Sequence, residues 1–100
     1  MTDVLLSLAM SVDAAQPVED LLLSRPDLVP GFTSSHAEGH GSAATLVDPA
    51  ELVAGHSERV IIRMVGMEES MEEVLALIKT ELPGVNIFYW LVPVLEKGRI

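Results

Sequence analysis

The sequence predicts an α+β domain in which two helices cover one face of a four-stranded antiparallel sheet. Segments with alternating apolar side chains and segments with helical spacing follow one another as strand, helix, strand, strand, helix, strand. This βαββαβ order is that of the ferredoxin-like fold, and right-handed crossovers leave few other arrangements. A chain of 100 residues supports one domain, so residues 1–100 are expected to form a single unit. A long polar loop, about residues 39–56, separates the second and third strands.

The first strand is predicted at residues 3–10, where apolar or small side chains occur on both faces, as in a central strand. The first helix follows directly. Asp13 can cap this helix and Gln16 can complete a capping box, which puts Pro17 in the first turn, where a missing N–H costs little. Pro26 disfavours helical geometry in the residue before it, so the helix is predicted to end near Ser24 or Arg25.

The second strand is predicted at residues 31–38 and the third at residues 57–66. Within the loop between them, residues 48–51 read Asp-Pro-Ala-Glu. This stretch has the marks of a helix start: a cap, a proline at the first position and an acid at the third. Gly55 can end this short helix after one to two turns.

A predicted capping box, formed by Ser70 and Glu73, begins the second main helix. Four glutamates lie near the N-terminus of this helix, where the helix dipole favours negative charge: Glu68, Glu69, Glu72 and Glu73. The helix is predicted to close at Pro83 and Gly84, because proline cannot continue it and glycine is common just after a helix.

The last strand is predicted at residues 86–95, and Pro93 within it indicates a sheet edge because proline cannot donate a ladder hydrogen bond. Two helices cover one face of the sheet, yet the second face is apolar as well. It is formed by Leu5, Ile61, Val65 and alternate residues of 87–92. Apolar patches of this size are unusual on monomers, so we expect an oligomer that buries this face.

Composition and charge exclude several classes of function. The chain has no cysteine, so it has no disulfide, no thiolate metal site and no cysteine nucleophile. The net charge of −9 argues against nucleic acid as a partner and against binding to an anionic membrane surface. The apolar stretch near the N-terminus is too short for a membrane span and has no basic residues before it, so a cytoplasmic location is expected.

Catalytic motifs are not apparent, and we expect no enzymatic activity. Ser34, Ser35 and His36 are adjacent, but neighbours on a strand point to opposite faces and cannot form a nucleophile–base pair. No glycine-rich phosphate loop with a lysine occurs in the chain.

Several short motifs, in order along nearly the whole chain, resemble the PII signalling proteins. They are Gly-Phe-Thr at 31–33, Gly-His-Gly at 39–41, Glu-Leu-Val-Ala-Gly at 51–55, Tyr-Trp-Leu-Val-Pro-Val at 89–94 and Gly-Arg-Ile at 98–100. Together they are similar to a small PII-like (GlnB-like) family often encoded beside heavy-metal efflux pumps. The architecture also resembles that of the divalent-cation tolerance proteins.

The resemblance implies a homotrimer whose sheets face inward, with a loop that orders around a small ligand and engages a partner protein, a transporter or a regulator. It implies ligand binding at Gly39 and Gly41, at the start of the loop, and at Lys97 and Arg99 near the C-terminus. The chain departs from the ATP-binding members, because residues 82–86 contain no basic residue. The loop also lacks the tyrosine that is modified in some PII proteins.

The three histidines predict a second possibility, a metal site at the two ends of the loop. His36, Glu38 and His40 alternate along a strand, so they share one face at steps of roughly 7 Å. His56 can add a further ligand from the other end of the loop. Imidazole with carboxylate suits zinc, copper(II) or nickel. A set of solvated polar residues on an edge strand is the favoured alternative, because this spacing permits a metal site without being diagnostic of one.

Two classes of function therefore stay open. One is a PII-like regulatory protein that senses a small ligand. The other is an accessory protein that chelates a divalent transition metal through the histidines. Fold analogy favours the first, while histidines at both ends of a loop without lysine or arginine favour the second.

Overall fold

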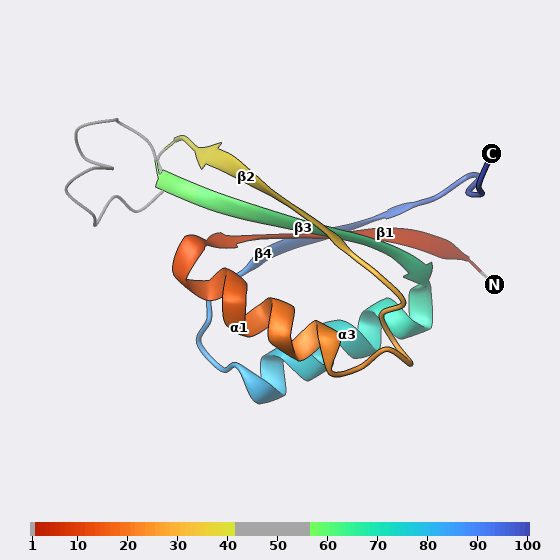
Figure 1. Ribbon diagram of the computed structural model, residues 1–100, viewed down its shortest axis with the longest axis horizontal. Coiled ribbons are helices and arrows are strands. Elements are labelled where there is room, and N and C mark those ends of the chain that lie inside the picture. The colour runs from red at the N-terminus through yellow and green to blue at the C-terminus, as the bar shows by residue number, and fades with distance from the viewer. Residues whose placement is uncertain (1, 42–56) are drawn as a thin grey trace.

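A computed structural model of the chain describes residues 2–41 and 57–100. Its elements are β1 (Asp3–Ser11), α1 (Val12–Leu23), β2 (Thr33–Gly39), β3 (Ser57–Met67), α3 (Glu68–Glu81) and β4 (Phe88–Pro93). The strands form one antiparallel sheet in the order β2-β3-β1-β4, and both helices lie on the same face of it (Figure 1). The predicted ferredoxin-like α+β fold is confirmed. The helix predicted from residue 48 lies outside the described residues.

The core lies between the sheet and the two helices. β1 is central, as predicted, and sends Val4, Leu6, Leu8 and Met10 toward the helices, where all four are buried. The helices contribute buried aliphatic side chains at helical spacing: Ala14, Ala15, Val18 and Leu22 from α1, and Met71, Val74, Leu75 and Ile78 from α3. This alternation in β1 and this spacing in the helices bring apolar side chains into one continuous layer.

Both predicted helix starts are wrong by a few residues. β1 runs directly into α1, so Ser11 occupies the cap position, Asp13 lies inside the first turn and Pro17 lies within the helix. Likewise β3 leads straight into α3 with Met67 as cap, so the predicted Ser70–Glu73 capping box does not form. At neither start does the cap side chain make a hydrogen bond. The packing of each helix against the sheet, rather than a capping residue, sets where it begins.

The outer strands also differ from prediction in length. β2 starts at Thr33 instead of residue 31, and β4 spans Phe88–Pro93 instead of residues 86–95. Asn86 has a φ of 58°, a left-handed conformation that interrupts an extended chain, so β4 starts after it. β4 is an edge strand, which confirms the position predicted from Pro93.

No described helix covers the second face of the sheet (Figure 1). The register pairs Leu5 with Val92, Ser7 with Trp90 and Ala9 with Phe88, so these side chains share the face opposite the helices. Phe88 is 72% exposed and Trp90 37% exposed, and their rings lie 5.8 Å apart. We call this surface the open face; its large apolar members are Leu5, Ile61, Val65, Phe88, Trp90 and Val92.

Two further features bear on later experiments. Arg25 and Asp27 form an exposed ion pair at 2.8 Å just after α1, and the hydrogen bond from Arg25 lowers the pKa of the Asp27 carboxyl. Because this pair lies away from every hollow described below, Arg25 serves as a control position. In the described part of the chain, no helix has the length and apolarity needed to cross a membrane.

Candidate functional site

The strongest candidate site lies where β2 ends at Gly39 and β3 begins at Ser57. A hollow of about 390 Å³ opens there on the open face. We call it the loop-base hollow; it is lined by Ala9, Ala37, Glu38, Gly39, His40, Arg59, Ile61, Asn86 and Phe88. All four strands and the segment before β4 thus contribute to it, although they are far apart in the sequence.

The polar groups of the loop-base hollow are diverse. The Nε2 atom of His40 lies 3.3 Å from Oε1 of Glu38, and both side chains are largely exposed. Arg59 adds a guanidinium group to the same hollow, and Phe88 adds an aromatic ring. A guanidinium group and an aromatic ring that line one hollow suit a ligand that combines a flat ring with an anionic group.

Gly39 is the last residue of β2 that pairs with β3. It pairs with Ser57, the first residue of β3, and the Ser57 hydroxyl donates a hydrogen bond of 3.5 Å to the Gly39 carbonyl oxygen. A Cβ atom on Gly39 would lie 2.6 Å from Oγ of Ser57 and 3.1 Å from Cγ of Arg59. Only glycine therefore lets the two strand ends come this close.

We expect the Gly39→Ala variant to lower the free energy of unfolding by about 1–3 kcal/mol, since overpacking forces Ser57 and Arg59 to move. Urea denaturation measures this change. Gly31→Ala is the matched control, because a Cβ atom at Gly31 meets nothing within 4 Å and its backbone is not left-handed. Equal stability of the two variants would contradict the close approach at Gly39.

The histidines predicted to bind metal are only partly brought together. His36 pairs with Val60 on the helix side of the sheet and lines a small hollow with Gln16 and Glu19 of α1. Glu38 and His40 lie together in the loop-base hollow, while His56 lies outside the described residues. Across residues 2–41 and 57–100, no three His, Asp or Glu side chains are grouped closely enough to hold a metal ion.

The predicted ligand-binding residues fall at opposite ends of the sheet. Gly39 and Gly41 lie at the loop base, and Gly41 has a φ of 108°. Lys97 instead forms an ion pair of 3.2 Å with Asp3, which pairs with Met67 at the other end of β3. Those ends are roughly 30 Å apart in an 11-residue strand. One chain therefore does not bring Lys97 and Arg99 to the glycines, and Figure 1 shows the C-terminus far from the C-terminal end of β2.

Arg59, Asn86 and Phe88 were not expected at the site. Alternation does place Arg59 on the same face as Ile61, but only the register with β2 puts it opposite Ala37 at the loop base. The left-handed backbone of Asn86 fits a residue type that adopts this conformation more readily than most. The sequence thus predicts on which face of the sheet Arg59 lies, but it does not predict which residues surround it there.

Solved structures show the same fold in proteins of low sequence identity. A DUF3240 family protein from Shewanella baltica OS155 has a TM-score of 0.79 and 17% identity, covering 100% of this chain and 98% of that one. CPII, a nitrogen regulatory PII-like protein from Thiomonas intermedia K12, has a TM-score of 0.70 and 16% identity over 100% and 98% of the two chains. CutA1 from Pyrococcus horikoshii has a TM-score of 0.67 and 13% identity over 95% and 86%.

These likenesses confirm the resemblance to PII-like proteins at the level of the fold. No curated protein matches the sequence. The sequence model of one family, described as "Protein of unknown function (DUF3240)", matches residues 1–100. The chain therefore belongs to the DUF3240 family.

Proposed function

We propose that this protein is a PII-like regulatory protein, without enzymatic activity, in which a small ligand binds at the loop base and controls contact with a partner protein. One observation carries the proposal: the loop-base hollow joins the last residues before the loop, Gly39 and His40, to Arg59, two residues after β3 begins. A ligand held there contacts residues on both sides of the segment 42–56 in the sequence. A ligand shifts the equilibrium between two loop conformations only if it binds one of them more tightly, and contacts on both sides of the loop allow such a difference.

The proposed assembly is a homotrimer that buries the open face and completes the ligand site. The loop-base hollow opens on that face, and Lys97 and Arg99 of the same chain lie at the far end of the sheet. In the trimer, we infer, a neighbouring copy supplies these two basic residues. The predicted ligand-binding set of Gly39, Gly41, Lys97 and Arg99 would then meet between subunits.

Adenine nucleotides and bicarbonate are the first ligand candidates. The CPII structure is described as bound to ADP, AMP and bicarbonate. In this chain Phe88 offers a ring for stacking a base, and Arg59 offers a fork of donors for a phosphate or carbonate oxygen. Residues 82–86 carry no basic side chain, so we propose AMP, ADP or bicarbonate in preference to ATP.

Calorimetric titration of the protein with AMP, ADP, ATP and bicarbonate tests this function. We expect Arg59→Gln to weaken binding about tenfold or more, because a hydrogen bond to a charged group contributes roughly 1.5–3 kcal/mol. Arg25→Gln removes the same charge away from the site and is expected to leave affinity unchanged. If none of these ligands bound, or if Arg59→Gln bound them as the parent does, the proposed site would be wrong.

Metal binding is the second candidate, and the Glu38–His40 pair favours it. An imidazole and a carboxylate 3.3 Å apart and largely exposed supply two donors that suit zinc, copper(II) or nickel. His56, or a histidine of another copy, would complete the set. A transporter for heavy-metal efflux is the partner that we propose in this case.

For the metal candidate we expect His40→Ala to cost more zinc affinity than His36→Ala, since His36 lies on the helix side. Binding needs neutral imidazole, so affinity should fall at acidic pH, where protons compete with the metal ion for the ring nitrogens. Zinc titration at two pH values measures both effects. A double variant, His36→Ala with His40→Ala, that bound zinc, copper and nickel as the parent does would exclude this candidate.

A further inference from the structure

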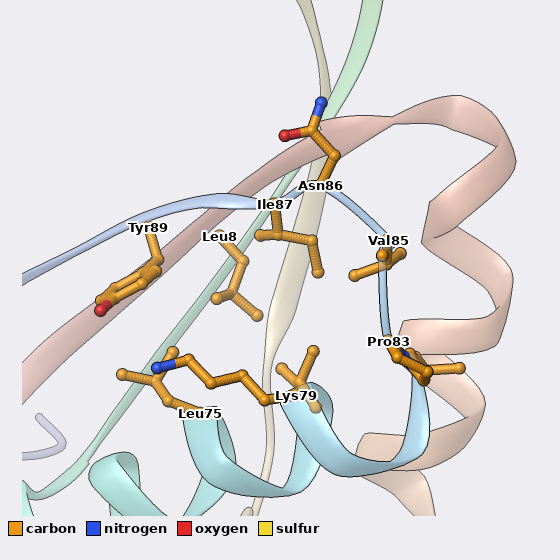
Figure 2. Close-up of a pocket in the computed structure, with 11 residues that line it drawn as sticks. Leu8, Leu75, Lys79, Pro83, Val85, Asn86, Ile87 and Tyr89 are labelled. Carbon is orange, nitrogen blue, oxygen red and sulfur yellow. The ribbon is translucent and has the colours of Figure 1, made fainter.

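A second cavity lies on the other side of the sheet, between the C-terminal half of α3 and the chain that leads into β4 (Figure 2). Its volume is about 310 Å³, at the lower end of the range for small-molecule sites. We call it the α3–β4 cavity. It is lined by Leu8, Leu75, Ile78, Lys79, Leu82, Pro83, Gly84, Val85, Asn86, Ile87 and Tyr89.

Most of the residues that line this cavity are apolar. Leu8 comes from the central strand β1, while Leu75 and Ile78 come from α3, and all three are buried in the core. The connection to β4 passes around the cavity, with left-handed turns at Gly84 and Asn86. Because the cavity lies on the helix side of the sheet, an oligomer that buries the open face leaves it accessible.

Two polar groups stand at one end of the cavity. In Figure 2 the ammonium group of Lys79 and the hydroxyl of Tyr89 both lie at the left-hand side of the hollow. The residues three and four positions from Lys79 along the helix are Leu75, Ala76, Leu82 and Pro83, so no acid of α3 neutralises it. In the part of the chain that the structure describes, Lys79 makes no ion pair.

We propose that the α3–β4 cavity binds a small amphipathic carboxylate, with its hydrocarbon chain against the half-buried Leu82, Val85 and Ile87 and its carboxylate on Lys79. The Tyr89 hydroxyl donates a hydrogen bond to the same carboxylate. Apolar burial supplies affinity, and the lysine selects the charge of the head group. The chain as a whole carries a net charge of −9, so an anion is attracted here only through this local cation. The α3–β4 cavity shares Asn86 with the loop-base hollow but opens on the opposite side of the sheet, and it does not rest on the function proposed for that hollow.

Octanoate is the probe, and octanol and octylamine are matched ligands with a neutral and a positive head group. We expect calorimetry to give the tightest binding for octanoate, weaker binding for octanol and no binding for octylamine. Lys79→Gln should weaken octanoate about fivefold to tenfold and leave octanol unchanged, because only the charge-assisted contact is lost. Added salt should weaken octanoate for the parent but not for Lys79→Gln.

Two further variants separate the site from general effects. Arg25→Gln removes an equal charge elsewhere and should bind octanoate as the parent does. Val85→Phe should fill the cavity and abolish binding of both octanoate and octanol while Lys79 stays in place; its circular dichroism checks the fold. Octylamine binding as tightly as octanoate, or unchanged octanoate affinity in Lys79→Gln, would overturn the proposal.

Discussion

A Trp90→Asp variant is expected to be monomeric in light scattering at micromolar concentration, where the parent protein is expected to be a trimer. Trp90 lies on the open face in the middle of β4, paired across the sheet with Ser7, and its ring lies 5.8 Å from that of Phe88 at a tilt of 46°. Burying this face removes a large aromatic surface from water, which is the main driving force for association. An aspartate at the same place would be buried without a partner, at a cost of several kcal/mol for each subunit.

Leu23→Asp is the control for this experiment. Leu23 is 68% exposed on α1, in the helix layer, so an added charge there stays in water and the trimer should persist. Circular dichroism of both variants checks that the fold is retained. A parent protein that scattered as a monomer, or a Trp90→Asp variant that stayed trimeric, would show that the open face is not the interface.

The same variant links assembly to the ligand site. If a neighbouring copy supplies Lys97 and Arg99 to the loop-base hollow, Trp90→Asp should lose nucleotide or bicarbonate binding although Arg59 is intact. Octanoate binding should survive in this variant, because the α3–β4 cavity is built within one chain. Binding of nucleotide or bicarbonate therefore reports on the loop-base hollow and on the trimer. Binding of octanoate reports on the α3–β4 cavity of a single chain.

The strands were predictable because successive side chains of a strand face opposite sides of the sheet, so buried residues recur at every second position. Leu6 and Leu8 face the helices while Leu5 and Ala9 face the other side, and each set is visible as every second residue of the sequence. The edge position of β4 was visible in Pro93 for the same kind of local reason. These features depend on the geometry of single strands, so the sequence contains them directly.

The helix starts were not predictable from capping residues. Ser70 and Glu73 have the spacing of a capping box, but α3 already begins at Glu68, directly after β3. There the backbone N–H of Glu68 donates a 2.9 Å hydrogen bond to the carbonyl of Thr2, a residue far away in sequence. A tertiary contact of this kind has no local signal, and it replaces the side-chain cap.

The residues of the candidate sites were harder still to predict, because the register between strands decides which residues lie side by side. The sequence marked Gly39 and His40 as special, but it gave no reason to place Arg59 and Phe88 beside them. That placement follows from Ala37 pairing with Arg59 and Ala9 with Phe88. The α3–β4 cavity likewise joins Leu8 of the first strand to residues 75–89, a proximity that only the folded sheet creates.

The Leu6→Ala variant is expected to lose about 2–5 kcal/mol of the free energy of unfolding, measured by urea denaturation at a fixed protein concentration. Leu6 is fully buried in the central strand, in the layer shared by both helices, so removing its branch leaves a cavity that rigid neighbours cannot fill. Leu23→Ala, at an exposed position, should change stability by no more than about 0.5 kcal/mol.

Ser7→Ala, one residue further along β1, is the sharper comparison. Ser7 is 1% exposed and points to the other side of the strand, and its Oγ has no hydrogen-bond partner among the residues that the structure describes. Removing a buried hydroxyl of this kind abolishes a desolvation cost of about 1–3 kcal/mol, so the variant should be as stable as the parent or more stable. If Ser7→Ala lost as much stability as Leu6→Ala, the hydroxyl would have a partner in the assembled protein. The loss would then depend on protein concentration, because it would act through the trimer.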